Sequence, residues 1–200
     1  MLLSNPGRVI NRYPNTRVLC RKDFFKNMMD IASDNDEDAF DFIPPSFTFP
    51  QDQEKFQAYA KANKGLTYIA KPMNGSQGEN IVLFQNPKNL DFDNSDQVVV
   101  QRYIDDPLLV DGFKFDLRIY VAVTGINNGE MHAFIADEGL ARFCTEQYHK
   151  PDRDNLGSAH MHLTNYSINK KSEEFVKESN VKNFLEPNDA SKRTLTALFK

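Results

Sequence analysis

The sequence predicts an α+β protein with antiparallel sheets and flanking helices. Helical patterns fall mainly in the first 65 residues, and strand patterns dominate between residues 66 and 136. Asn128-Gly129 separates the last two strand patterns and predicts a tight hairpin turn, which joins antiparallel strands. With 40% hydrophobic residues and 16 phenylalanines, 200 residues can build one large domain or two small lobes.

The helical elements come first. Residues 1–20 are polar and irregular, with turn signals at 5–7 and 13–15. Residues 23–31 predict a short helix with an apolar side, and residues 51–63 predict a polar helix. Between them, the acidic stretch 34–38 predicts a solvated loop. Calcium binding there is disfavoured, because the later glycine and glutamate of an EF-hand loop are missing.

The remaining elements are strands, a long loop and a last helix. Strands are predicted at Leu66–Ala70, Ile81–Phe84, Val98–Ile104, Lys114–Thr124 and Met131–Ala136. A long loop is expected over 146–160, and a helix over 191–200. That helix stops without a cap or breaker, so we expect the chain to be part of a longer protein.

Composition excludes several classes of protein. A net charge of −4 and a pI of about 5.6 argue against nucleic-acid binding. No apolar run is long enough for a membrane span, and the N-terminus lacks the pattern of a signal peptide. Cys20 and Cys144 are therefore expected to be buried thiols, neither paired nor metal-bound, in a cytosolic protein.

The segment 112–123 carries the most informative pattern. Lys114, Asp116 and Arg118 alternate with apolar residues, so a strand here has one apolar face and one face with a cation, an anion and a cation. A solvated strand face would show the same pattern.

A glycine-bearing loop joins two strands between residues 68 and 84. Gly75, Ser76 and Gly78 could let backbone amides surround a phosphate, with Lys71 reaching over it. Because the lysine precedes the glycines and the loop returns into a strand, this is not a Walker loop. The alternative is a hairpin with a surface lysine.

Other polar positions suggest binding groups. The strand 98–104 turns polar at its end, where backbone groups could meet a base edge; a buried strand entering a loop is the alternative. Arg142 suits a carboxylate, although surface arginines are common. His160 and His162 would share a strand face, but zinc needs a third ligand, so phosphate binding by Thr164 and Asn165 is the better reading.

Taken in order, these motifs resemble one family. The resemblance rests on Leu19–Asp23, Lys71-Pro72 with Gln77-Gly78, Gln101–Ile104, Asp105–Gly112, Lys114–Arg118, Glu138–Phe143 and His162–Lys170. Together they closely resemble the tubulin tyrosine ligase-like enzymes over about residues 12 to 200. Tyr166–Lys170 and Ser191–Arg193 are most similar to the branch that adds glutamate, not tyrosine or glycine.

The resemblance implies the ATP-grasp fold, in which two α+β lobes hold ATP, here incomplete. It divides the chain into an N-terminal region 1–65, a phosphate-loop lobe with the adenine hinge 66–105, and part of a C-terminal lobe 106–200. The implied reaction phosphorylates a glutamate carboxylate in a tubulin C-terminal tail. The amine of free glutamate then attacks the acyl phosphate.

The resemblance also assigns ATP contacts. The lysines at 22 and 71 would contact phosphates, and residues 77–78 would belong to the loop that closes over them. Residues 101–104 would hold adenine, and residues 164–165 would lie beside the phosphates. The full nucleotide set is Lys22, Lys71, Gln77, Gly78, Gln101, Arg102, Tyr103, Ile104, Lys114, Asp116, Thr164 and Asn165.

Catalysis and glutamate binding are assigned in the same way. Arg118 would face the transferring phosphate, and Arg142 would bind the incoming glutamate with Tyr166 and Lys192. No residue of this chain is assigned to a metal, and the ligands of Mg²⁺ are expected beyond residue 200.

Two departures from the family pattern leave alternatives open. The family has Gly-Arg/Lys-Gly-Ile in the phosphate loop, where this chain has Gly78-Glu79-Asn80-Ile81. The missing magnesium carboxylates fit either a fragment, which alone would be inactive, or a degenerate homologue. The alternatives to a polyglutamylase are thus an inactive tubulin- or microtubule-binding homologue, and an ATP-grasp ligase for another carboxylate acceptor.

The implied partners are tubulin or microtubule C-terminal tails and free glutamate, with no nucleic acid and no membrane. The implied protein is a monomer in the cytoplasm and on the microtubule cytoskeleton, with cilia and basal bodies as candidate sites.

Overall fold

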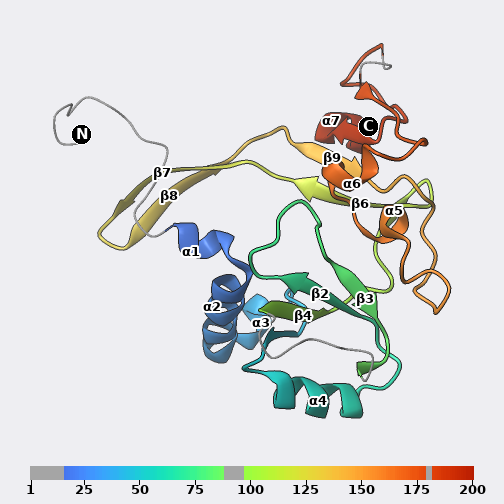
Figure 1. Cartoon of the computed structure of the whole chain (residues 1–200). Coiled ribbons are helices and arrows are strands. Elements are labelled where there is room, and N and C mark those ends of the chain that lie inside the picture. Colours follow the sequence, from blue (N-terminus) through green and yellow to red (C-terminus); the bar gives the residue numbers. More distant parts are fainter. Residues whose placement is uncertain (1–15, 88–96, 179–181) are drawn as a thin grey trace, which may run out of the picture. The chain divides into compact units, whose positions relative to one another are not determined.

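The computed structural model describes residues 16–87, 97–178 and 182–200. The chain forms two compact units (Figure 1), and each is described by itself. The first unit comprises Met1–Asn74 and Gln85–Arg102, and the second comprises Gly75–Phe84 and Tyr103–Lys200. The irregular segment and turn signals predicted for residues 1–15 lie outside the described residues.

The first unit is built on an antiparallel sheet of β1 (Ser46–Phe49), β4 (Val98–Arg102) and β2 (Tyr68–Pro72), with β4 between the other two. The helix α4 (Gln53–Ala62) supplies Phe56, which is 1% exposed. Its ring lies 5.4, 5.6 and 5.0 Å from those of Phe47, Phe49 and Tyr68. Burial of these large rings accounts for the core of this unit.

One predicted helix of the first unit is longer than predicted, and the other is slightly shorter. α1 (Arg17–Cys20) precedes α2 (Lys22–Asn35), which confirms the predicted helix and extends it, and α4 confirms the polar helix. The prediction of a loop over residues 34–38 is wrong, since these residues end α2 and begin α3 (Glu37–Phe40). The Asp36 carboxylate accepts the amide of Ala39 at 3.1 Å, so an acidic residue caps a helix where a loop was expected.

The second unit contains the antiparallel sheet β10 (Lys192–Thr194), β9 (Leu140–Phe143), β6 (Phe113–Arg118) and β5 (Leu109–Val110). β3 (Val82–Phe84) and the short helices α5 (Ala159–His162), α6 (Tyr166–Asn169) and α7 (Leu195–Phe199) also belong to it. The helix predicted over 191–200 is partly wrong, because its first residues form β10 before Thr194 caps α7.

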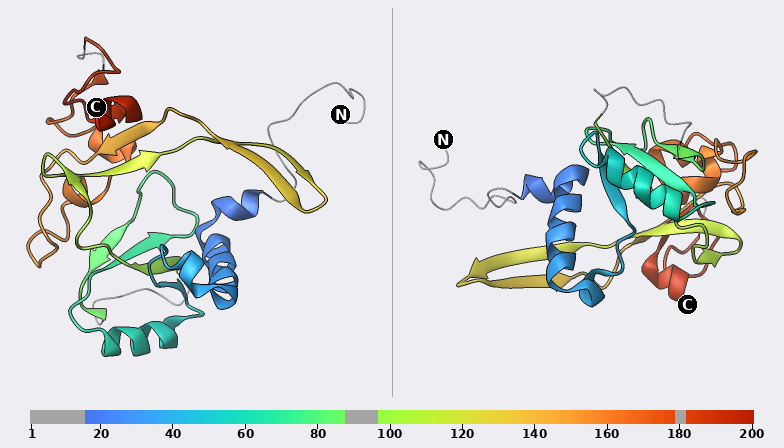
Figure 2. Two further views of the ribbon diagram at one scale, coloured as in Figure 1. Left: turned by 180° about the vertical axis from the view of Figure 1, so that it is seen from behind. Right: turned by 90° about the horizontal axis from the view of Figure 1, so that it is seen from below.

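The predicted strand 114–124 is two strands. β6 ends at Arg118, and β7 (Val121–Asn127) pairs with β8 (Glu130–Ile135) in a hairpin that extends from the β6–β9 sheet (Figure 2). Asn128 and Gly129 have φ values of 50° and 84°, which confirms the predicted turn. The apolar face of the segment is largely exposed, with Leu117 at 43% and Val121 at 57%.

The other strand predictions agree with β2, β3, β4 and β8 to within two residues, whereas β1, β5, β9 and β10 were not predicted. The loop after residue 146 is confirmed as far as Ser158. Cys144 is buried as expected, but Cys20 is exposed, so that prediction is wrong. Within the described residues, no helix has the length and apolar character to cross a membrane.

Candidate functional site

The predicted site residues fall in both units. The first unit holds Lys22, Lys71, Gln101 and Arg102. The second holds the rest: Gln77, Gly78, Tyr103, Ile104, Lys114, Asp116, Arg118, Arg142, Thr164, Asn165, Tyr166 and Lys192.

Two lysines of the predicted site line the same cavity in the first unit. Lys71 on β2 donates its Nζ to Gln101 Oε1 at 2.8 Å, and Lys22 at the start of α2 donates to the carbonyl of Pro72 at 2.8 Å. Gln101 in turn donates to Ser46 Oγ at 2.8 Å, so its side chain orients Lys71. Both lysines line a cavity of about 180 Å³.

The positive charge of Lys22 disfavours the charged form of Lys71. Burial and, after it, the charge of Lys22 lower the pKa of Lys71, and burial lowers the pKa of Lys22. A phosphate would relieve this repulsion, because an anion near both groups favours their charged forms. The pair is therefore suited to an anionic ligand. Arg102, at the end of β4, is exposed.

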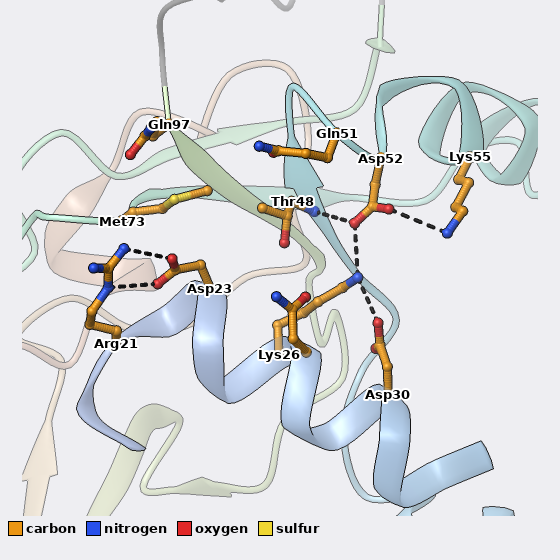
Figure 3. Close-up of a pocket in the computed structure, with 11 residues that line it drawn as sticks. Arg21, Asp23, Lys26, Asp30, Thr48, Gln51, Asp52, Lys55, Met73 and Gln97 are labelled. Carbon is orange, nitrogen blue, oxygen red and sulfur yellow. Dashed lines mark hydrogen bonds and ion pairs between the residues drawn. The ribbon is translucent and has the colours of Figure 1, made fainter. Parts of the chain in front are cut away.

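A second pocket in the first unit, of about 380 Å³, is lined by charged side chains that pair with one another (Figure 3). Lys26 Nζ lies 2.7 Å from Asp30 and 2.8 Å from Asp52, whose carboxylate also accepts the amide of Thr48 at 2.9 Å. Burial disfavours the charge of Lys26, but its bonds to Asp30 and Asp52 outweigh this and raise its pKa. This network joins α2 to β1 and α4, and sequence reasoning missed it.

The loop predicted to cover phosphates packs on α6 in the second unit. Gln77 and Gly78 have φ values of 59° and 86°, and a Cβ on Gly78 would lie 2.5 Å from Ile168 Cδ1. The Ser167 hydroxyl donates to the carbonyl of Gln77 at 2.5 Å. The same Cβ would lie 3.1 Å from Asn165, so the loop and the predicted phosphate contacts at 164–165 are brought together.

The departure from the family pattern in this loop has two parts. Asn80 has a φ of 53°, the left-handed conformation that glycine adopts most readily and that asparagine tolerates better than most residues. The loss of a glycine is thereby accommodated. Glu79 is exposed, so its negative charge is the departure that bears on phosphate binding.

Lys114 on β6 is held by its surroundings. Its Nζ donates to the Tyr103 hydroxyl at 2.8 Å and to the carbonyl of His162 at 2.9 Å, and it lies 4.3 Å from the centroid of the Tyr103 ring. His160 and His162 lie in α5, not on a strand face as predicted. Ile104, the end of the predicted hinge, is 57% exposed.

The next polar residue of β6, Asp116, pairs with Arg142 on β9. Arg142 donates Nε and Nη2 to the two carboxylate oxygens at 2.8 and 2.5 Å, and this bond raises the pKa of Arg142. The strand register places Arg142 opposite both Asp116 and Lys192. Lys192 forms an ion pair with Glu178 and lies 5.2 Å from the centroid of the Tyr166 ring.

Asp116, Arg142 and Lys192 thus form a row across β6, β9 and β10, with Tyr166 beside it. The three residues predicted for the incoming glutamate, Arg142, Tyr166 and Lys192, come together within the second unit. Arg118, at the end of the same face of β6, is exposed and has no side-chain partner among the described residues.

Sequence reasoning missed three features of this site: the Asp116–Arg142 pair, the Lys192–Glu178 pair, and the contacts of Tyr103 and His162 with Lys114. The only available signal was the alternation in 114–118, which identifies the polar face but not what it meets. Among the described residues, no group of three or more His, Cys, Asp or Glu could hold a metal ion.

Comparison with known proteins agrees with the predicted resemblance. The tubulin-tyrosine ligase family model matches residues 1–197. This chain belongs to the tubulin-tyrosine ligase family. The mixed α/β architecture with antiparallel sheets confirms the coarser fold prediction.

The chain is similar to several tubulin polyglutamylases. Over 189 residues it is 38% identical to tubulin polyglutamylase TTLL13 of Homo sapiens, covering 94% of this chain and 22% of that protein. Over 191 residues it is 39% identical to tubulin polyglutamylase ttll6 of Danio rerio, covering 96% and 23%. It is 38% identical to human tubulin polyglutamylase TTLL7, covering 93% and 20%. The chain therefore spans about a fifth of the length of these relatives.

Proposed function

We propose that this chain is the ATP-binding and central part of a tubulin polyglutamylase with an ATP-grasp fold. The main support for this proposal is the row of Asp116, Arg142 and Lys192, with Tyr166 beside it. Arg142 and Lys192 are each paired with a carboxylate of this chain, but their remaining hydrogens can hold a further carboxylate, and the aromatic ring beside them can border the rest of an amino acid.

The proposed reaction has two steps. A glutamate side chain in a tubulin C-terminal tail attacks the terminal phosphorus of ATP, which forms an acyl phosphate and releases ADP. The amine of free glutamate then attacks the acyl carbon, loses a proton, and displaces phosphate as the amide forms. Such a reaction depends mainly on positioning and on neutralising charge.

The described residues suit these requirements. Lys22 and Lys71 offer two closely placed cations to phosphates, and Lys114 and Arg118 lie on one face of β6. In this proposal Arg118 meets the transferring phosphate, and Arg142 with Lys192 holds the carboxylate of the incoming glutamate. Magnesium would further neutralise the phosphates, held by residues beyond position 200.

We propose that the protein acts as a monomer on microtubules in the cytoplasm. The polyglutamylases to which the chain is similar support tubulin as the acceptor.

Glutamate incorporation tests this proposal. The full-length protein that carries this sequence should transfer labelled glutamate to tubulin when ATP and Mg²⁺ are present, and not to tubulin whose C-terminal tails have been removed. Transfer of only tyrosine or glycine would contradict the glutamate assignment.

An inactive microtubule-binding homologue is the second candidate, and the exposed Glu79 in the phosphate loop favours it. Such a protein would bind microtubules, and ATP would not raise its melting temperature, whereas an ATP-binding protein gains stability in proportion to the logarithm of ligand concentration over Kd. Ligation of glutamate to a free acid, without transfer to tubulin, would instead identify a ligase for another carboxylate acceptor.

A further inference from the structure

A buried tyrosine–histidine pair holds the side chain of Lys114. Tyr103 is 5% exposed and His162 is 2% exposed. The Tyr103 hydroxyl lies 3.1 Å from His162 Nδ1 and accepts from Lys114 Nζ at 2.8 Å. The carbonyl of His162 accepts a second hydrogen bond from the same Nζ. Tyr103 and His162, which contact each other, therefore both hold one ammonium group.

The proton positions in this network follow from its acceptors. His162 Nε2 lies 3.1 Å from the carbonyl of Asn155, which can only accept, so Nε2 carries the hydrogen. In the neutral ring, Nδ1 is then an acceptor, and the Tyr103 hydroxyl can donate to it. The phenolic oxygen keeps its lone pairs for Lys114. One neutral tautomer of His162 therefore satisfies its contacts with Asn155 and Tyr103 together.

The surroundings of His162 favour that neutral form. The charged and titratable groups that face it are Lys114, Tyr103, Tyr148, Glu146 and Asp152. Burial, followed by the positive charge of Lys114, lowers the pKa of His162 and outweighs the opposite effects of the two carboxylates.

We propose that Tyr103 and His162 are positioning residues that hold Lys114 in place for its contact with the nucleotide. The inference rests on the proposed function, because the nucleotide contact of Lys114 is part of it. A free lysine side chain has many rotamers, and ordering it on binding opposes affinity. Here the order exists beforehand, supplied by the hydroxyl of Tyr103 and the carbonyl of His162.

A double-mutant cycle on ATP affinity tests the inference with the full-length protein. Tyr103→Phe removes one bond to Lys114 and should weaken ATP binding about tenfold, as expected for one hydrogen bond to a charged group. In a Lys114→Met background, the same substitution should have no further effect, because Tyr103 acts through Lys114.

His162 supplies a second arm and a matched control. His162→Leu removes the acceptor for Tyr103 and should also weaken ATP binding, whereas His162→Asn, which restores an acceptor oxygen, should recover part of the loss. The control is His160→Leu, since His160 lies in the same helix, is partly exposed, and has its Nδ1 3.7 Å from Glu146 instead of in contact with Lys114. It should leave ATP affinity unchanged.

The outcomes separate this inference from the proposed function. Failure of the wild-type protein to bind ATP overturns the proposed function and removes the inference with it. ATP binding in which Tyr103→Phe and Lys114→Met have additive effects overturns the inference alone, because it shows that the Tyr103 hydroxyl affects ATP affinity independently of Lys114. If Tyr103→Phe does not fold, the cycle between His162→Leu and Lys114→Met gives the same decision.

Discussion

Replacing Arg142 with glutamine should separate glutamate binding from folding. Arg142 donates Nε and one Nη2 hydrogen to Asp116, and its remaining hydrogens, on Nη1 and Nη2, stay available to a second carboxylate. Glutamine keeps part of the side-chain length but has no charge. Arg142→Gln should therefore abolish a charge-assisted contact with glutamate and also leave Asp116 without its cation.

The two losses differ in size. Hydrogen bonds to a charged group contribute about 1.5–3 kcal/mol, so removing the substrate contact should raise KM for glutamate about 10- to 150-fold. The side chains of Arg142 and Asp116 are 22% and 37% exposed, so solvent screens their pair. We expect the free energy of unfolding to fall by about 1–2 kcal/mol, less than for a fully buried pair.

The assay is the initial rate of glutamate incorporation at saturating ATP, with denaturant unfolding measured on the same variants. Arg193→Gln is the matched control. Arg193 follows Lys192 on β10, so its side chain projects from the opposite face of the sheet, where it lies 4.2 Å from the centroid of the Phe143 ring and pairs with Asp111. This control should lose stability but keep the wild-type KM for glutamate.

A folded Arg142→Gln variant with an unchanged KM for glutamate would refute the reasoning. An equal rise of KM in Arg193→Gln would also count against it, since the effect would then follow the stability of the sheet and not the polar row.

Three further substitutions test other parts of the molecule. Lys22→Met should raise the pKa of Lys71 toward its ordinary value by removing a like charge; an NMR titration that shows no rise would contradict the coupling. Thr48→Val should be neutral or stabilise by up to about 1 kcal/mol in denaturant unfolding, because the buried Thr48 hydroxyl has no hydrogen-bond partner among the described residues; a clear loss of stability would reveal one. Gly78→Ala should lower the free energy of unfolding by about 1–2 kcal/mol because Gly78 has a positive φ. Adding Ile168→Ala to this variant should remove only the steric contact with the new Cβ; full recovery of stability in denaturant unfolding would show that φ is unimportant.

Local signals predicted the elements that depend on local physics. The hairpin turn at Asn128-Gly129 requires two positive φ values, which these residues favour, and α4 follows from helical periodicity. The prediction of one strand over 114–124 was wrong because the alternation of polar and apolar residues continues past the point where the pairing partner changes. β6 pairs with β9 up to Arg118, while β7 pairs with β8, and a change of partner leaves no mark in the alternation.

The site shows the same division between local and long-range information. The alternation identified the polar face of β6, yet the partner of Asp116 lies 26 residues away and is set by strand register. The acidic residues 34–38 were assigned to a loop by charge alone, although Asp36 is a good helix cap. Nothing local to Cys20 shows that α1 leaves its thiol exposed.

The Asp116–Arg142 pair changes what can be expected of Asp116. Its two oxygens each accept one bond from Arg142, but a carboxylate has about four lone-pair sites, so it could still accept a hydroxyl of the nucleotide. Lys114 precedes it by two residues on the same face of β6, about 7 Å away along the strand. In the proposed enzyme, one carboxylate could thus contact the nucleotide while orienting the arginine that receives glutamate. Asp116→Asn should then weaken the binding of both substrates, whereas Arg142→Gln should act mainly on glutamate.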